Sequence, residues 1–262
     1  MKMIQLRPRN FFVCSSILVA LSAACTQAYA GTFTVGDLYD FEGYTAGDSI
    51  STADDPISVI NSGTTLSIAQ PGGVGTNKLL DFTTNTNFRG FETAVAPGSG
   101  LSQATISFDV DSVALASTNN RLDIALFDGD GVETAGFQLR RNSTTSLRFS
   151  IFGDGASQND FVTYANFDGL SLSIDWNNTT DKFIVSGSYN STIPSESDTF
   201  SNVEFDFLAP STSDFSYVEY TLSAANDSAG IDNLQVIPEP NQAALAMGVS
   251  LLVFLMARRK RS

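Results

Sequence analysis

From residue 104 to residue 237 one short pattern recurs: an apolar residue stands at every second position, with polar residues between. In Leu170–Trp176, for example, leucine, leucine, isoleucine and tryptophan alternate with serine, serine and aspartate. Successive side chains of a β-strand point to opposite faces of its sheet, so a period of two predicts strands with one buried face. The same pattern occurs in Ala104–Val110, Arg121–Phe127, Thr134–Arg140, Ser146–Ile151, Lys182–Tyr189, Phe215–Leu222 and Ile231–Ile237.

Turn-forming residues separate the predicted strands. Asp128–Gly131, Gly153–Gly155 and Asn177–Thr180 are rich in Asp, Asn, Gly and Thr, which favour tight turns. Strands joined by short turns pair antiparallel, and two such sheets bury their apolar faces by packing against each other. The sequence therefore predicts an all-β protein, an antiparallel β-sandwich, with Trp176 in its core.

The prediction is less regular in two places. Gly136 interrupts the pattern of its strand, which indicates a β-bulge at the glycine. Nearer the N-terminus, weaker patterns predict strands at Ile57–Ile60, Thr65–Ala69 and Lys78–Phe82. Neither a linker nor an internal repeat divides residues 31–237, so they are expected to form one domain.

The first 30 residues are typical of a secretory signal peptide. Basic residues precede the apolar run Phe11–Ala24, and Ala28 and Ala30 form the small-x-small site that signal peptidase cleaves. A lipoprotein signal ending at Cys25 fits less well, because no leucine stands three residues before it. The mature chain is expected to begin at Gly31 and to lack cysteine, since both cysteines lie in the removed segment.

Residues 238–262 form a three-part tail. It begins with Pro238, Glu239 and Pro240, continues with the uncharged run Ala243–Ala257, and ends in the basic residues Arg258, Arg259, Lys260 and Arg261. As a helix the apolar run would be about 22 Å long, and snorkelling arginines would help it to span a bilayer. The basic end is expected to stay cytoplasmic, which places the rest of the chain across the membrane.

This tail resembles the PEP-CTERM sorting signal of Gram-negative bacteria. Pro238, Glu239 and Pro240 match its motif, and the apolar run and basic cluster match the other two parts. The resemblance implies recognition by exosortase, a membrane cysteine protease that cuts near the motif, and a place at the cell surface or in an exopolysaccharide matrix. A plain C-terminal anchor is the alternative.

Charge and composition exclude several function classes. All 28 acidic residues lie from Asp37 to Glu239, where only seven of the 14 basic residues are found, so this part carries a net charge near −21. Such a surface repels nucleic acid and anionic lipid. The chain has no histidine, which excludes a Ser-His-Asp triad and the usual zinc sites.

Two segments that bracket the body, Tyr39–Tyr44 and Gly230–Val236, together with the strand pattern resemble concanavalin A-like or LamG-type jelly rolls. The resemblance implies that the first and last strands lie side by side. It also implies a structural calcium ion with Glu42 and Asp232 as ligands, because Ca²⁺ prefers carboxylate and carbonyl oxygens. Glycan binding, for example to exopolysaccharide, is a function implied by the same resemblance.

A glycoside hydrolase on the same fold is the main alternative. Laminarinase-like enzymes carry Glu-x-Asp-x-x-Glu on one strand, with the two glutamates as nucleophile and general acid–base. The nearest match here has Glu204 and Asp206 but Ala209 in the place of the second glutamate, and alanine transfers no proton. The sequence therefore predicts a non-enzymatic protein; a purely structural matrix protein is the third alternative.

Candidate sites for sugar stacking and for a second calcium ion are fewer. The tyrosines that could form surface rings are Tyr164, Tyr189, Tyr217 and Tyr220. Asp128–Gly131 resembles half of a calcium loop, but an EF-hand would need a glutamate at position 139, which is leucine. A hairpin turn is the favoured interpretation of this segment.

Overall fold

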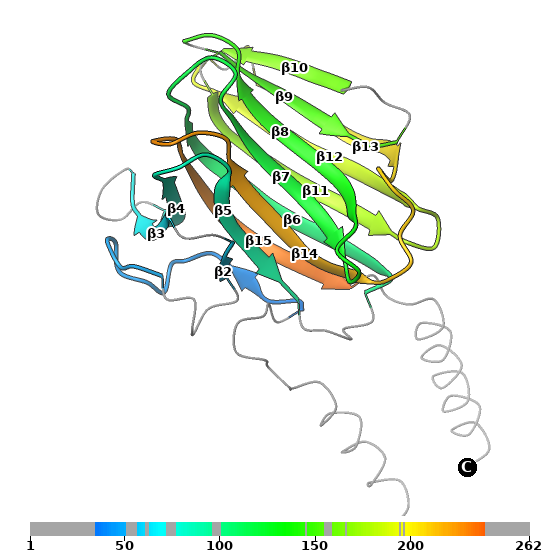
Figure 1. Cartoon of the computed structure of the whole chain (residues 1–262). Helices are drawn as coiled ribbons and strands as arrows, with labels where there is room; N and C mark the ends of the chain where they lie inside the picture. Colours follow the sequence, from blue (N-terminus) through cyan, green and yellow to red (C-terminus); the bar gives the residue numbers. More distant parts are fainter. Residues whose placement is uncertain are drawn as a thin grey trace, which may run out of the picture.

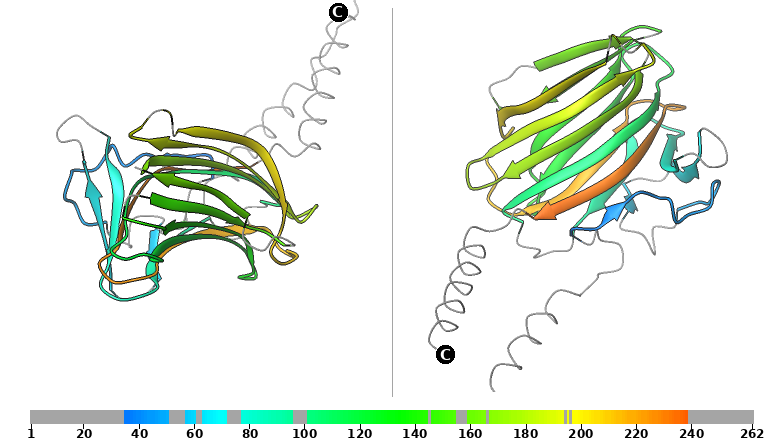
Figure 2. Two further views of the ribbon diagram at one scale, coloured as in Figure 1. Left: turned by 90° about the horizontal axis from the view of Figure 1, so that it is seen from above. Right: turned by 180° about the vertical axis from the view of Figure 1, so that it is seen from behind.

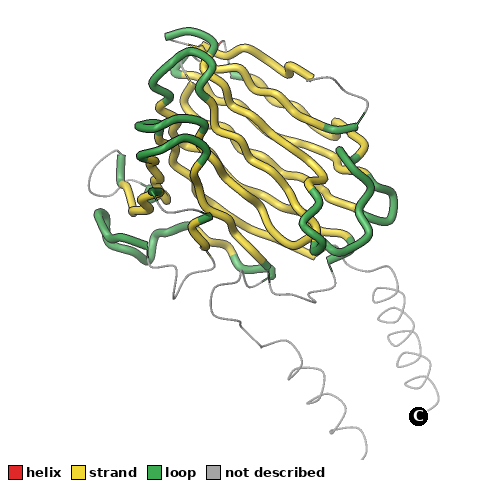
Figure 3. The backbone as a smooth tube through the Cα atoms, viewed as in Figure 1, coloured by secondary structure: helices red, strands yellow, loops and turns green. Residues whose placement is uncertain are grey.

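The computed structural model describes residues 35–50, 57–60, 63–71, 77–95, 101–144, 146–154, 159–165, 167–193, 195 and 197–238. These residues form strands, turns and loops arranged as two facing β-sheets (Figures 1 and 3). In these ranges there is no helix long and apolar enough to cross a membrane. The predicted apolar run Ala243–Ala257 lies outside the described residues.

One sheet has eight strands within the described residues. Its order is β13 (Asp198–Asp206), β12 (Lys182–Ser191), β11 (Phe167–Asn177), β6 (Gln103–Ala114), β15 (Ser228–Pro238), β4 (Leu79–Thr84) and β3 (Thr64–Ala69), with β1 (Leu38–Tyr39) also on β15. Leu38 pairs with Gln235 and Tyr39 with Leu234, so the first and last strands lie side by side, as predicted.

The other sheet has seven strands in the same described ranges. Its order is β10 (Asn159–Ala165), β9 (Ser146–Phe152), β8 (Glu133–Arg141), β7 (Arg121–Asp128), β14 (Phe215–Leu222), β5 (Arg89–Ala94) and β2 (Ile57–Val59). Every strand pairing in both sheets is antiparallel, which confirms the predicted all-β antiparallel sandwich. Both sheets curve, and the outer face of the seven-stranded sheet lies on the inside of the curve (Figure 2).

The alternating apolar residues fill the space between the sheets, as predicted. Trp176 on β11 is completely buried, and its indole N–H donates to the Oγ1 of Thr134 on β8 over 2.9 Å. Thr134 in turn donates to the carbonyl oxygen of Leu126 over 3.1 Å. Because β11 and β8 belong to different sheets, this buried chain of hydrogen bonds joins the two layers.

Thr134 reaches the core because of a β-bulge. Leu126 pairs with Ala135 and Phe127 with Glu133, so Thr134 is the extra residue on β8. The predicted bulge at Gly136 was wrong: Gly136 pairs in regular register with Ala125. A bulge redirects a side chain, and here it turns the hydroxyl toward the indole.

The sequence pattern missed several strands. The edge strand β13 lies largely exposed, so it lacks the buried apolar face that alternation reveals. The strand β5 is short and places Gly90 and Glu92 on either side of its one large apolar residue, Phe91. The strand β10 was missed as well, whereas those predicted from the weaker N-terminal patterns are present as β2, β3 and β4.

Replacing Thr134 with valine tests the hydrogen bond between the layers. Valine has nearly the same shape but leaves the indole N–H of Trp176 buried without a partner. We expect the free energy of unfolding to fall by about 1–3 kcal/mol in denaturant titrations. Thr65→Val, at an exposed position of β3, is the matched control and should change it by less than about 0.5 kcal/mol. Equal effects of the two substitutions would contradict this account.

Candidate functional site

The outer face of the seven-stranded sheet carries a continuous set of buried and half-buried residues, most of them polar or aromatic. We call this set the concave face. It consists of residues that alternate with core residues and lie in cross-strand register: Gly90, Glu92 and Ala94 of β5, Tyr217, Glu219 and Thr221 of β14, Arg121, Asp123, Ala125 and Phe127 of β7, Gly136, Gln138 and Arg140 of β8, and Arg148, Ser150 and Phe152 of β9.

Curvature shelters this face. Gln138 is only 9% exposed and Ser150 only 1%, although both alternate with residues of the core. On the eight-stranded sheet the outward positions of β11, such as Ser171 and Ser173, are less buried. A ligand on the concave face would therefore lose more water contacts than a ligand on the opposite side of the molecule.

Two aromatic rings stand together on this face. Phe127 and Tyr217 occupy neighbouring strands in register, and their rings stack with centroids 4.6 Å apart at an angle of 9°. The next residues around them are small: Ala94 pairs with Tyr217, and Ala125 pairs with Gly136 in the adjacent row. The rings thus rise beside a low part of the sheet surface.

Carboxylates surround the rings. Glu92 and Glu219 lie directly opposite each other on β5 and β14. Partial burial, followed by the charges of Glu92 and Glu133, raises the pKa of Glu219 above its ordinary value. Partial burial also raises the pKa of Glu92, and partial burial and the charge of Asp123 raise that of Glu133. Burial and then the charge of Glu219 raise the pKa of Tyr217.

Glu133 reaches over the glycine of the adjacent row. Its Oε1 lies 3.2 Å from the place where a Cβ atom on Gly136 would stand, so a larger residue there would push the carboxylate aside. Asp123 completes the acidic group and accepts from two neighbours, Gln138 Nε2 and Arg121 Nε, each over 2.7 Å. The face therefore combines stacked rings with fixed acceptors, which suits a polyhydroxylated ligand.

The two residues expected to hold calcium, Asp232 and Glu42, differ in their burial and in their hydrogen bonds. Asp232 on β15 is fully buried; its Oδ2 accepts from Asn77 Nδ2 over 2.5 Å, and its Oδ1 has no hydrogen-bond partner. Burial raises the pKa of Asp232 to about 7. Glu42 is more exposed: its Oε1 accepts from the backbone N–H of Lys78 over 2.7 Å, and its carbonyl oxygen accepts from Lys78 Nζ.

Asp232 therefore fits the chemistry of a cation ligand, because a buried carboxylate oxygen without a partner needs a proton, a water molecule or a cation. Glu42 reaches the same neighbourhood through Lys78, the residue after Asn77, but its side-chain and backbone oxygens are engaged by that lysine. Across the described ranges, no three acidic side chains lie close enough together to bind one metal ion.

The other residues predicted to form sites lie in different parts of the structure. Tyr189 and Tyr220 are core residues, so the prediction of surface rings was wrong for both, while Tyr217 lies on the concave face. Asp128–Gly131 is a turn, in which Asp128 Oδ1 accepts from the N–H groups of Asp130 and Val132. The partial glycosidase motif lies on the edge strand β13, where Glu204 and Asp206 form ion pairs with Lys182.

The sorting residues lie at or beyond the ends of the described chain. Pro238 is the exposed last residue of β15. Glu239, Pro240 and the basic cluster Arg258, Arg259, Lys260 and Arg261 lie outside the described residues, as do Ala28 and Ala30 of the predicted cleavage site.

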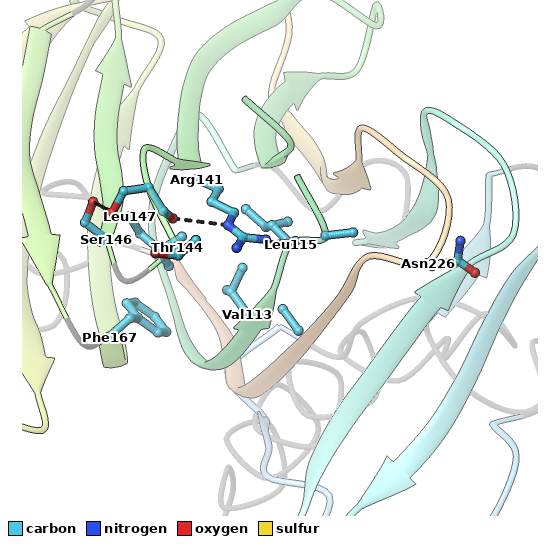
Figure 4. A pocket seen from close by; sticks show the side chains of 11 residues that line it. Val113, Leu115, Arg141, Thr144, Ser146, Leu147, Phe167 and Asn226 are labelled. Atoms are coloured by element: carbon cyan, nitrogen blue, oxygen red, sulfur yellow. Dashed lines mark hydrogen bonds between the residues drawn. The ribbon is translucent and has the colours of Figure 1, made fainter. Parts of the chain in front are cut away.

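A cavity of about 470 Å³ opens elsewhere, beside the ends of β6 and β8 (Figure 4). Val113, Leu115, Leu147 and Phe167 give it an apolar lining. Among the described residues that line it, only Arg141 is charged, and it donates to the carbonyl oxygens of Leu115 and Ser143. Because the guanidinium holds backbone groups and no acid joins it, this lining offers less polar chemistry than the concave face.

The concave face was missed in the sequence for a simple reason. Its residues are the polar half of the alternating pattern, and the sequence shows which residues point outward but not which strands are neighbours. Phe127 and Tyr217 are 90 positions apart in the chain. Only the pairing of β7 with β14 brings the two rings together.

No family model matches this chain, and no curated protein matches it. Solved structures are similar in shape. The globular domain of T. cruzi calreticulin gives a TM-score of 0.46 at 10% identity, covering 80% of this chain and 91% of that one. The legume lectin-like domain from Entamoeba histolytica gives 0.42 at 11%, covering 75% and 100%. Cellulose induced protein Cip1 gives 0.45 at 13%, covering 78% and 97%. At such identities and scores the similarity concerns overall shape alone.

Replacing Glu219 with glutamine should stabilise the protein at pH 7. The raised pKa means that the native state binds the proton more tightly than the unfolded state, so wild-type stability falls as the pH rises through the native pKa. Removing one of two opposed charges should raise the free energy of unfolding by about 0.2–1 kcal/mol.

Urea titrations at pH 7 and pH 3 measure this gain, which should disappear at pH 3, where the glutamates are protonated. Glu204→Gln, on the exposed edge strand β13, is the control and should bring no gain. A Glu219→Gln protein that is less stable than the wild type at pH 7, or equally stabilised at both pH values, would contradict the interpretation.

Proposed function

We propose that this chain is an exported, non-enzymatic protein of the cell surface or exopolysaccharide matrix, and that its concave face binds a glycan. The observation that carries the proposal is the Phe127–Tyr217 pair, stacked on a sheltered face and surrounded by acceptors. Sugar rings have an apolar side that packs on aromatic rings and hydroxyl groups that donate to carboxylates. Aromatic rings and carboxylates are both present on the neighbouring strands of the concave face.

Removing the rings tests the glycan site directly. A screen of neutral polysaccharides identifies a ligand, and isothermal titration then compares the wild type with Tyr217→Ala and Phe127→Ala. Each variant should bind at least about tenfold more weakly, because the loss of ring contact and apolar burial exceeds 1.4 kcal/mol. Leu208→Ala removes an exposed apolar side chain outside this face and should leave binding unchanged.

Absence of binding to any glycan would instead favour a purely structural matrix protein. Undiminished binding by both ring variants would show that glycan is held elsewhere on the molecule.

Export and sorting are part of the same proposal. The signal peptide would direct the chain across the inner membrane, and the tail from Pro238 onward would hold it there until exosortase cuts. The exposed end of β15 at Pro238 supports this, because a protease needs an accessible chain next to its motif.

The intact mass of the protein from the surface fraction of its host checks both steps. We expect a chain that begins at Gly31 and ends near residues 238–240. A mass that still includes residues 243–262 would contradict processing by exosortase and favour a permanent anchor.

A structural calcium ion held by Asp232 is also proposed, with Glu42 nearby. Its support is the buried Oδ1 of Asp232, which has no partner. If the ion binds, saturating calcium should raise the melting temperature over that in chelator by about 5–10 °C. Asp232→Asn should abolish this increment, whereas Asp206→Asn on the exposed edge should keep it. Equal melting temperatures of the wild type in calcium and in chelator would exclude the site.

A glycoside hydrolase remains the second candidate function, and one observation favours it. Glu92 and Glu219 lie opposite each other, as two catalytic carboxylates would, and the raised pKa of Glu219 suits a general acid. Release of reducing sugar from a polysaccharide, lost in Glu219→Gln, would establish this activity. Without such release the binding role stands.

A further inference from the structure

Three arginines form a row across the concave face. Arg121 on β7 pairs in register with Arg140 on β8, and Arg140 pairs with Arg148 on β9. Neighbouring strands lie about 4.8 Å apart, so the row spans roughly 10 Å. Like charges placed directly opposite each other on one face destabilise a sheet, and such an arrangement needs an explanation.

The row is notable because basic residues are scarce. Seven basic residues face 28 acidic ones from Asp37 to Glu239, and three of those seven stand in this row. With four acids for every basic residue in this part of the chain, a charged cross-strand partner of an arginine would more often be an acid than another arginine.

Arg121, at one end of the row, has a carboxylate and an aromatic ring beside it. Arg121 Nε donates to Asp123 Oδ2 over 2.7 Å, and its guanidinium lies 5.4 Å from the ring centre of Phe88. Asp123 also accepts from Gln138, so its two oxygens are both engaged. Within the part of the chain that the structure describes, no ion pair or side-chain hydrogen bond involves Arg140.

The position of the row relates it to the proposed glycan site. Arg121 and Phe127 stand on the same strand, six residues and therefore roughly 20 Å apart, with Asp123 and Ala125 between them on the same face. One end of the face is thus basic, and the other carries the stacked rings and the glutamates. A sugar chain laid across β7, β8 and β9 would follow the row and lie at the end of the face away from these glutamates.

We propose that the row Arg121, Arg140 and Arg148 binds the anionic groups of an acidic polysaccharide. This rests on the proposed glycan-binding function and adds the class of ligand. A guanidinium group presents two parallel N–H donors to a carboxylate and stays charged at any physiological pH. Adjacent arginines one strand spacing apart match the repeat of a polymer that carries charge along its length. The remaining acidic surface repels the same polymer, so contact is confined to the row.

Binding of the purified protein to polygalacturonate, dextran sulfate and dextran tests the proposal. The titrations are run in chelator, which prevents calcium from bridging acidic polymer and acidic protein. Polygalacturonate should bind at least tenfold more tightly than dextran. Arg140→Gln should weaken that binding about tenfold or more, because a charge-assisted hydrogen bond is lost. Arg140→Lys keeps the charge but not the paired donors, so its affinity for polygalacturonate should lie between those of the wild type and Arg140→Gln.

Two controls separate recognition from folding. Lys182→Gln removes the same charge from the opposite sheet and should leave polygalacturonate affinity unchanged. Polygalacturonate should raise the melting temperature of the wild type and not that of Arg140→Gln. The melting temperature of Arg140→Gln without ligand should equal or exceed that of the wild type, since a like-charge contact is removed.

The outcomes divide clearly. If dextran sulfate binds more tightly than polygalacturonate and Arg140→Gln weakens this binding too, the result supports the anion site and assigns it to sulfate groups. Equal binding of polygalacturonate by wild type and Arg140→Gln overturns the inference, as does binding of an oligonucleotide with the same arginine dependence. If neutral glycan binds and acidic glycan does not, the inference fails while the proposed function stands; if no glycan binds, both fail.

Discussion

Edge-on contacts between aromatic rings of opposite sheets hold this sandwich together, and the rest of the molecule depends on them. Phe82 meets Phe91, Phe108 meets Tyr220, Phe137 meets Phe183 and Trp176 meets Phe215, with centroids 4.9–6.1 Å apart and interplanar angles of 63–85°. Each pair takes one ring from each sheet. Edge-to-face geometry suits the quadrupoles of the rings, and large rings bury much area for each strand they occupy.

Because the inner half of each strand supplies this core, the outer half is free to vary. On the eight-stranded sheet it is mainly serine, threonine and aspartate, which keep the surface in water. On the seven-stranded sheet the same positions hold stacked rings, opposed glutamates and a row of arginines. Opposed like charges cost stability, and on this face they stand beside a pair of stacked rings, a combination that distinguishes it from a merely solvated surface.

The sequence predicted the sandwich well where the physics is local. The alternation within Leu170–Trp176 predicts which face of this strand is buried, and Trp176 is buried as expected. Predictions failed where the structure depends on contacts between residues that are far apart in the sequence. The bulge lies at Thr134 rather than Gly136 because the indole of Trp176 offers the hydroxyl a partner from another strand. The partial glycosidase motif lies within the single strand β13, whereas the acids of the concave face, Glu92, Glu219 and Asp123, come from three strands. Strand order is a non-local property, so no local pattern discloses it.

Hydrogen exchange of the protein with and without bound polysaccharide tests the central claim, that the concave face is the binding face, most directly. The account predicts slower amide exchange in β7, β8 and β14 on binding, with unchanged exchange in β11 and β12 of the opposite sheet. Protection confined to the eight-stranded sheet, or to the residues around the cavity beside β6, would contradict it.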